Sequence, residues 1–263
     1  MIELNELIDV NDFFENFWNR KKFHKTMSPL PEAEAIDLEF LIGKASGDPG
    51  YLAGGYVRHT LVSQEGNTPQ EKQTIISDVS GLEKAVNEGG SLVFNHFQEV
   101  LPAGHCFQKL LSQLARATCS NDAQIAFFYT PGYEQGFVKH IDHNDFFTIQ
   151  LKGEKKWQTY GKNPFYKRGE EGTEPKDDTI LLAENDFLYL PRNTIHEVSG
   201  LGNESLSVSF ILKTDTVLDV MVKIMTRNMY RHQHAVALYD SYNPCLGSEY
   251  LNQPSIREIF LNL

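Results

Sequence analysis

Residues 205–211 read Ser-Leu-Ser-Val-Ser-Phe-Ile, in which small polar and apolar side chains alternate. Successive side chains of a β-strand point to opposite faces, so this run has one small polar face and one apolar face. A strand that lines a polar interior and packs its outer face against a hydrophobic layer shows this pattern. The run therefore favours a barrel or sandwich with a polar-lined interior.

Short strand-like runs separated by Pro, Gly, Asn and Asp fill the region around this segment. The predicted strands cover residues 124–129, 137–142, 146–151, 157–160, 179–182, 187–190 and 205–211. So many short strands in one continuous region predict a β-barrel or sandwich rather than alternating strands and helices.

Helical spacing of apolar residues appears on both sides of this β-region. Helices are predicted over residues 13–18, 32–44, 80–88, 107–114 and 216–230, with a buried strand at 91–94 and loops or short strands from 45 to 73. We therefore predict three parts: a helical and mixed region (1–90) that supports the barrel, the barrel core (91–213) and a C-terminal helical region (214–263) suited to dimerisation.

The composition of the 263 residues is that of a globular protein, with 41% hydrophobic and 22% charged residues. The 24 basic residues against 35 acidic ones give a formal net charge of -11, which disfavours nucleic acid and anionic membranes and favours a basic partner. The three cysteines are widely spaced, and the sequence shows neither a signal-peptide pattern nor an apolar run long enough to span a membrane. We expect a soluble, cytoplasmic protein.

A candidate metal site begins at His140 and Asp142, which lie two residues apart on a predicted strand and therefore on the same face. His-x-Asp alone is a weak signal. A second element, Asn185 to His196, is a strand that ends in Pro and a tight turn and presents another histidine. Two histidines and one carboxylate on a β-scaffold are typical of non-haem Fe(II) sites, although the same set also describes catalytic zinc sites.

The segment Lys152-Gly153-Glu154-Lys155-Lys156-Trp157 could serve the same site. If a 2-oxo acid filled the open metal positions, its distal carboxylate would need a cation, because an unpaired buried carboxylate is costly. The alternative is that these lysines form a solvated hairpin face, as lysine clusters usually do.

Taken together, residues 129–142, 152–157, 189–191 and 196 resemble the cupin-type JmjC oxygenases, particularly the ribosomal oxygenase group. The aromatic segment 13–23 resembles the N-terminal helix of that group. The resemblance implies a mostly β fold with flanking helices, built on a double-stranded β-helix (cupin or jelly-roll) barrel. It also implies Fe(II), 2-oxoglutarate and O2, and hydroxylation of an amino-acid side chain in a protein or peptide with succinate and CO2 as co-products.

Carried over by position, the resemblance makes His140, Asp142 and His196 the metal ligands and the catalytic residues. It places Lys155 against the distal carboxylate of 2-oxoglutarate and Tyr129 and Thr148 in the same cofactor pocket. It also favours a homodimer through C-terminal helices.

The chain departs from the family pattern in two turns and in its C-terminal region. Asn185 and Asn193 stand where the family has glycine, and Asn tolerates positive φ better than most residues. The region after the barrel is shorter than in the ribosomal oxygenases, which leaves the substrate open. The alternatives are a hydroxylase of a small molecule or biosynthetic peptide, an N-methyl demethylase, and a non-catalytic metal-binding cupin.

Overall fold

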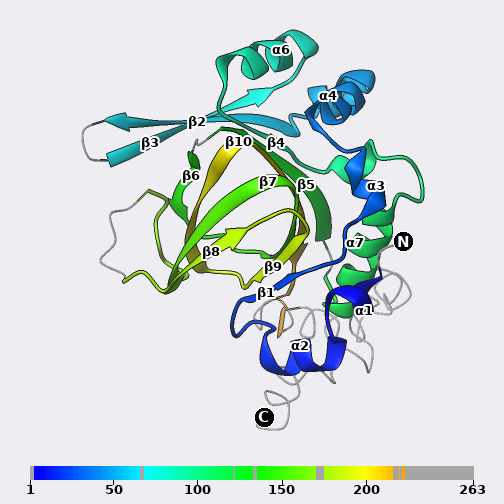
Figure 1. Ribbon diagram of the computed structural model, residues 1–263, viewed down its shortest axis with the longest axis vertical. Coiled ribbons are helices and arrows are strands. Elements are labelled where there is room, and N and C mark those ends of the chain that lie inside the picture. Colours follow the sequence, from blue (N-terminus) through cyan, green and yellow to red (C-terminus); the bar gives the residue numbers. More distant parts are fainter. Residues whose placement is uncertain are drawn as a thin grey trace, which may run out of the picture.

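The computed structural model describes residues 3–65, 68–120, 122–132, 135–169, 175–215, 219, 221 and 222 (Figure 1). The elements in chain order are α1 (Leu4–Leu7), α2 (Val10–Asn16), β1 (Phe23–Thr26), α3 (Pro31–Glu34), α4 (Leu38–Gly47), α5 (Pro49–Ala53), β2 (Val57–Glu65), β3 (Thr68–Ile76), α6 (Val79–Glu88), β4 (Ser91–Phe94), η1 (Phe97–Glu99), α7 (Cys106–Ala117), β5 (Asp122–Pro131), β6 (Gln135–His140), β7 (Asp145–Lys162), β8 (Asp178–Leu182), β9 (Asp186–Leu190) and β10 (Thr194–Lys213).

Two long strands, β7 and β10, pair antiparallel along almost their whole length and form the spine of the barrel (Figure 1). Their first and second halves take different neighbours. The first half of β10 pairs with β6 and its second half with β5, while β7 pairs with β9 and then with β8. Two sheets connected through two shared, bent strands make a double-stranded β-helix, which confirms the predicted fold class.

The bend in β7 falls at Gly153, where the strands predicted at 146–151 and 157–160 join into one. Gly153 has φ +63°, and a Cβ atom there would overlap the carbonyl oxygen of Glu204 on β10. Any side chain would therefore collide with the neighbouring backbone. Gln150 supports the bend by donating hydrogen bonds to the carbonyl of Lys152 (2.8 Å) and the hydroxyl of Ser205 (2.8 Å).

The two faces predicted for residues 205–211 are confirmed. Ser207 and Ser209 line the cavity of the barrel, whereas Leu206, Val208 and Phe210 are fully buried in the main hydrophobic core. Helix α7 covers this outer face, and its Phe107 ring lies 5.8 Å from that of Phe210. The apolar layer thus holds the sheet from outside and leaves the interior free for polar groups.

The N-terminal aromatic segment packs on the same core. Phe13 of α2 is 1% exposed, and its ring centroid lies 4.9 Å from that of Tyr189 and 5.6 Å from that of Phe147. The helix begins one turn earlier than its sequence suggests, because Asp9 is the N-cap and accepts a hydrogen bond from the Asp12 backbone N–H (3.0 Å).

The region before β4 differs from the sequence prediction in two ways. The helix expected over 32–44 is split into α3 and α4, and the segment expected to hold loops contains the long hairpin β2–β3. This hairpin pairs with β4 and extends the sheet beyond the barrel (Figure 1). Most of the helix predicted over 216–230, and with it the expected dimer contact, lies outside the described residues; residues 219, 221 and 222, which are described, are helical. Among the helices described, none has the length and apolar character needed to cross a membrane.

Candidate metal centre and cofactor pocket

The strands β6 and β10 bring the two candidate histidines together. His140 ends β6 and is paired in register with His196 on β10, and their ring centroids are 4.4 Å apart. Asp142 was predicted on the same strand as His140, but the strand ends at His140 and Asp142 lies in the turn that follows. This turn directs the carboxylate back toward both imidazoles.

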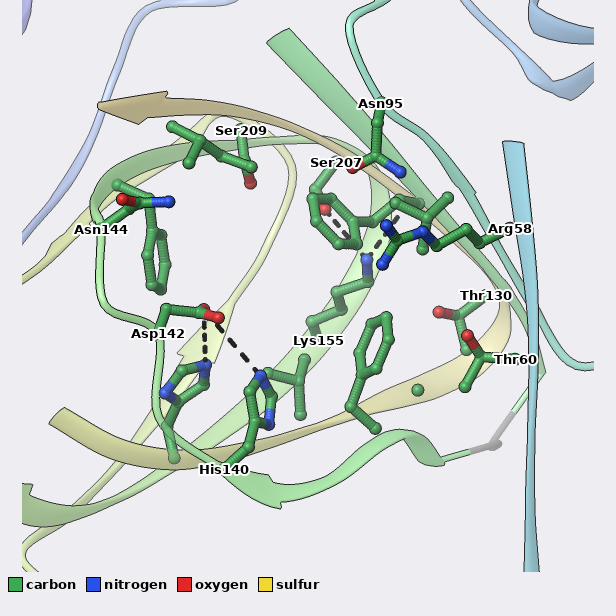
Figure 2. A pocket seen from close by; sticks show the side chains of 18 of the residues that line it. Arg58, Thr60, Asn95, Thr130, His140, Asp142, Asn144, Lys155, Ser207 and Ser209 are labelled. Atoms are coloured by element: carbon green, nitrogen blue, oxygen red, sulfur yellow. Dashed lines mark hydrogen bonds and ion pairs between the residues drawn. The ribbon is translucent and has the colours of Figure 1, made fainter. Parts of the chain in front are cut away.

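The three side chains form one compact donor set (Figure 2). The Oδ2 atom of Asp142 is 3.9 Å from Nε2 of His140 and 3.6 Å from Nε2 of His196, and all three donor atoms lie within 4.8 Å of one another. Metal–ligand bonds of about 2.0–2.2 Å place neighbouring ligand atoms about 3–3.5 Å apart, so a modest contraction suffices to hold one ion.

Backbone hydrogen bonds orient both imidazoles for metal binding. Nδ1 of His140 donates to the carbonyl oxygen of Val138 (2.7 Å), and Nδ1 of His196 donates to that of Thr194 (2.9 Å). A carbonyl oxygen only accepts, so the proton is on Nδ1 and the lone pair of Nε2 faces Asp142. Burial lowers the pKa of His140 and of His196, which keeps both rings neutral and able to bind a cation.

A buried ion pair joins the turn that carries Asp142 to the turn that precedes His196. Asp145 is fully buried and accepts hydrogen bonds from the Tyr189 hydroxyl (2.9 Å) and the Arg192 backbone N–H (3.2 Å), and Arg192 Nε lies 3.2 Å from its other oxygen. In addition, the backbone N–H of Asn193 donates to the carbonyl of Asp142 (2.7 Å). These contacts fix the distance between the turns, and thereby the spacing of the ligands.

Lys155 lies inside the barrel rather than on a solvated hairpin face. It is 3% exposed, and its ammonium group donates to the Ser207 hydroxyl (2.9 Å) and the Phe128 carbonyl (3.1 Å). Among the described residues no carboxylate is paired with it, and burial lowers its pKa to about 7. A buried ammonium group without an anion is costly unless a ligand supplies the negative charge.

His140, Asp142, His196 and Lys155 line one cavity of about 270 Å³. Three polar atoms of its walls are buried and have no hydrogen-bond partner among the described residues: the Thr60 hydroxyl, the Gln124 Oε1 and the Trp157 indole N–H. Buried polar groups are usually satisfied, so these atoms indicate that the cavity binds a polar ligand. The ring of Trp157 also stacks on that of His196, with centroids 5.5 Å apart.

This part of the chain also matches a known protein family in sequence. Residues 97–220, which contain the triad and Lys155, match the family model of the JmjC domain. This part of the chain is similar to a JmjC domain.

Curated relatives of this part of the chain are similar over a limited region. The chain is 33% identical over 95 residues to the bifunctional lysine-specific demethylase and histidyl-hydroxylase NO66 of Aedes aegypti, covering 32% of this chain and 15% of that protein. It is 32% identical over 93 residues to ribosomal oxygenase 2 of Rattus norvegicus, covering 33% of this chain and 20% of that protein. The chain thus spans a fifth or less of the length of either relative.

Solved structures share the fold over most of the chain. The ribosomal oxygenase YcfD of Escherichia coli superposes with a TM-score of 0.59 at 15% identity, covering 97% of this chain and 70% of that one. A second structure of YcfD, in complex with cobalt and 2-oxoglutarate, gives a TM-score of 0.54 at 17% identity with the same coverage. At this identity the likeness shows that this chain has the same fold.

Two residues assigned to the pocket by resemblance do not line it. Tyr129 lies on the other face of β5, packs against the main core and donates its hydroxyl to Glu204 (3.3 Å). Because strand residues alternate, its neighbours Phe128 and Thr130 line the JmjC cavity instead. Thr148 is paired in register with Ser209 and shares a hydrogen bond with its hydroxyl (2.7 Å), so it faces the same side of the sheet but is buried beside the cavity lining.

The sequence also left several polar lining residues of the JmjC cavity unidentified. Arg58 and Gln73 come from the hairpin β2–β3, Asn95 follows β4, and Arg168 follows β7. Arg168 is bound to Glu71 of β3 by nitrogen–oxygen contacts of 2.7–3.1 Å. No local motif marks these residues, because the sheet register alone brings them to the cavity.

Proposed function

We propose that the protein is an Fe(II)- and 2-oxoglutarate-dependent oxygenase that hydroxylates an amino-acid side chain in a protein or peptide. The single observation that carries the proposal is the His-Asp-His triad in one cavity with a buried lysine that no carboxylate of the described residues pairs with. The names of the relatives, a lysine-specific demethylase and histidyl-hydroxylase and a ribosomal oxygenase, support an oxygenase that acts on amino-acid side chains.

The donor set fits Fe(II). Two neutral imidazoles and one carboxylate on one side of an ion leave the other positions open for a co-substrate and O2. His140, Asp142 and His196 would hold the ion, which would supply the activation of O2.

Lys155 would bind the distal carboxylate of 2-oxoglutarate by a charge-assisted hydrogen bond. The reaction balances as 2-oxoglutarate, O2 and the substrate C–H giving succinate, CO2 and the substrate C–OH. The carboxylate would neutralise the buried ammonium group of Lys155, which is costly in the free protein. Removal of this cost would favour binding of 2-oxoglutarate.

The remaining walls would orient the reactants and exclude water. Phe137, Phe146 and Trp157 surround the two histidines with aromatic rings, at centroid distances of 5.5–5.7 Å from one or the other. Such walls limit unproductive reaction with solvent. The odd number of widely spaced cysteines favours a reducing compartment, so we propose a cytoplasmic location for the reaction.

An anaerobic titration tests the proposal. Addition of Fe(II) and then 2-oxoglutarate to the purified protein should produce a visible metal-to-ligand charge-transfer band. The band should be absent in His140→Ala, and Lys155→Ala should need at least about tenfold more 2-oxoglutarate to form it.

Lys156→Ala is the matched control for the lysine, because Lys156 is the next residue on the same strand and does not line the cavity. It should behave like the wild type. A folded, metal-bound wild-type protein without the band would contradict the oxygenase proposal and favour a zinc site or a non-catalytic cupin.

A further inference from the structure

The hairpin β2–β3 adds one wall to the cavity, beyond the strands that carry the triad and Lys155. Arg58 on β2 is in register with Val93 on β4, which is in register with Phe128 on β5, and Phe128 with Ser207 on β10. Paired residues have side chains on the same face of a sheet, so the side chain of Arg58 lies on the same face as that of Ser207. Ser207 is the residue whose hydroxyl accepts a hydrogen bond from Lys155. Figure 2 shows its guanidinium group pointing into the cavity.

Thr60, two residues further along β2, faces the same cavity. It is 1% exposed, and its hydroxyl has no hydrogen-bond partner among the described residues. In Figure 2, Arg58 and Thr60 lie on the side of the cavity away from Asp142, and Lys155 lies between. A guanidinium group and a buried, unsatisfied hydroxyl on one strand face are suited to bind one carboxylate.

Arg58 is an exposed side chain of the cavity wall, so solvent reaches its guanidinium group and a ligand can bind to it. Arg168 is neutralised by Glu71, and no carboxylate within the described parts of the chain pairs with Arg58. On the proposed function, the two positive charges of Fe(II) and the one of Lys155 are balanced by Asp142 and the two carboxylates of 2-oxoglutarate. The loaded cavity therefore has one uncompensated positive charge, on Arg58.

We infer that Arg58 and Thr60 form a carboxylate-binding subsite for the substrate that is hydroxylated. The substrate would carry a carboxylate, such as an Asp or Glu side chain, within reach of the cavity. This inference rests on the proposed function and adds the substrate class to it. A cationic side chain is disfavoured because it would meet the uncompensated positive charge of Arg58.

The local charge of the cavity is opposite to that of the whole chain. The formal net charge of -11 attracts basic partners at long range, whereas the cavity attracts anions at short range. Long-range attraction is screened by salt over about 8–10 Å, so the cavity decides which side chain reacts. An acidic residue within an otherwise basic segment would satisfy both.

The first arm of the test asks whether Arg58 instead serves the co-substrate. The charge-transfer titration is repeated with Arg58→Gln, Thr60→Val and the control Lys72→Gln, which removes a positive charge from the exposed face of the same hairpin. We expect the concentration of 2-oxoglutarate at half-saturation to stay within about twofold of the wild type in all three. A rise of tenfold or more in Arg58→Gln would assign Arg58 to 2-oxoglutarate and overturn the inference.

The second arm measures side-chain preference. Three capped pentapeptide libraries with Asp, Asn or Arg at the central position and mixed residues elsewhere are incubated with Fe(II), 2-oxoglutarate and O2, and peptide oxidation is read by mass spectrometry. We expect the Asp library to be oxidised at least about tenfold faster than the Asn library, and the Arg library least. Arg58→Gln should reduce the Asp preference to within about twofold, Thr60→Val should reduce it in part, and Lys72→Gln should keep it.

The outcomes separate the two proposals. Three results would overturn the carboxylate subsite: equal oxidation of the three libraries, faster oxidation of the Arg library, or peptide oxidation no faster than without the enzyme. In each case the charge-transfer band would still support the oxygenase. Absence of the band in the wild type would overturn the proposed function itself, and the subsite with it.

Discussion

The interior of the barrel contains two regions of opposite character. In one, Ile180, Leu182, Leu188 and Leu190 form a small apolar cluster that is at most 7% exposed. In the other, His140, His196 and Lys155 are equally buried but polar, and Asp142 beside them is partly exposed. Phe146, Trp157 and Val198 belong to the cluster and also line the cavity. The apolar region stabilises the barrel, whereas the polar region is costly until a ligand satisfies it.

The largest effect on stability is expected in the apolar region. Leu188→Ala removes a fully buried side chain and should lower the free energy of unfolding by about 2–5 kcal/mol. Metal affinity of the folded protein should not change, since Leu188 does not line the cavity. Chemical denaturation measures the first quantity and calorimetry with Mn(II) the second. The control Leu181→Ala, at a side chain that is 59% exposed, should change stability by no more than about 0.5 kcal/mol.

The second prediction concerns the ion pair that joins the ligand turns. Asp145→Asn keeps the shape of the side chain but removes its charge from Arg192, so the turns lose their fixed spacing. We expect Mn(II) affinity to fall by about 10–100-fold, as for other residues that orient metal ligands.

Asp186→Asn is the matched control for this substitution. Asp186 is also a buried carboxylate, but it bonds Thr26 (2.6 Å) and His24 (3.1 Å) rather than the ligand turns. It should cost stability and leave Mn(II) affinity unchanged. Wild-type affinity in folded Asp145→Asn would show that the pair is structural only.

The third prediction reverses the usual sign of a core substitution. Lys155→Met replaces a buried cation by an apolar side chain, and should raise the free energy of unfolding by about 1–3 kcal/mol while 2-oxoglutarate binding is lost. The folded protein loses the Lys155 proton near pH 7, whereas the unfolded chain keeps it to about pH 10.5. The cost of the lysine is therefore full below pH 7 and decreases as the pH rises. A gain in stability that does not depend on pH, or a loss, would contradict the burial of the charge.

The smallest effect is on the pH dependence of co-substrate binding. Only the ammonium form of Lys155 pairs with a carboxylate, and its pKa in the free protein is about 7. The apparent dissociation constant of 2-oxoglutarate should therefore be flat below pH 7 and rise toward about tenfold per pH unit above it. Lys155→Arg keeps its charge over this range, so its binding curve should stay flat. The same pH dependence of the dissociation constant in the wild type and in Lys155→Arg would contradict the role of Lys155 in binding 2-oxoglutarate.

The sequence predicted the barrel because its alternating pattern extends over many strands. It also predicted the turns correctly at Asn185 and Asn193, which have φ +68° and +62° where the family has glycine. Local chemistry was sufficient there, because Asn is among the few side chains that accept this conformation.

Errors arose where tertiary structure decides. An offset of one residue moves a side chain to the other face of a strand, which is why Phe128 and Thr130, and not Tyr129, line the cavity. Arg58 was missed because its segment lacks a clear alternation of polar and apolar residues, and only pairing with β4 brings it to the cavity.

A crystal structure grown without oxygen, with Mn(II) and N-oxalylglycine in place of Fe(II) and 2-oxoglutarate, tests the central claim most directly. The account predicts an anomalous peak between His140, Asp142 and His196, and the distal carboxylate of the analogue within hydrogen-bond distance of Lys155. A metal bound elsewhere, or a carboxylate away from Lys155, would contradict it.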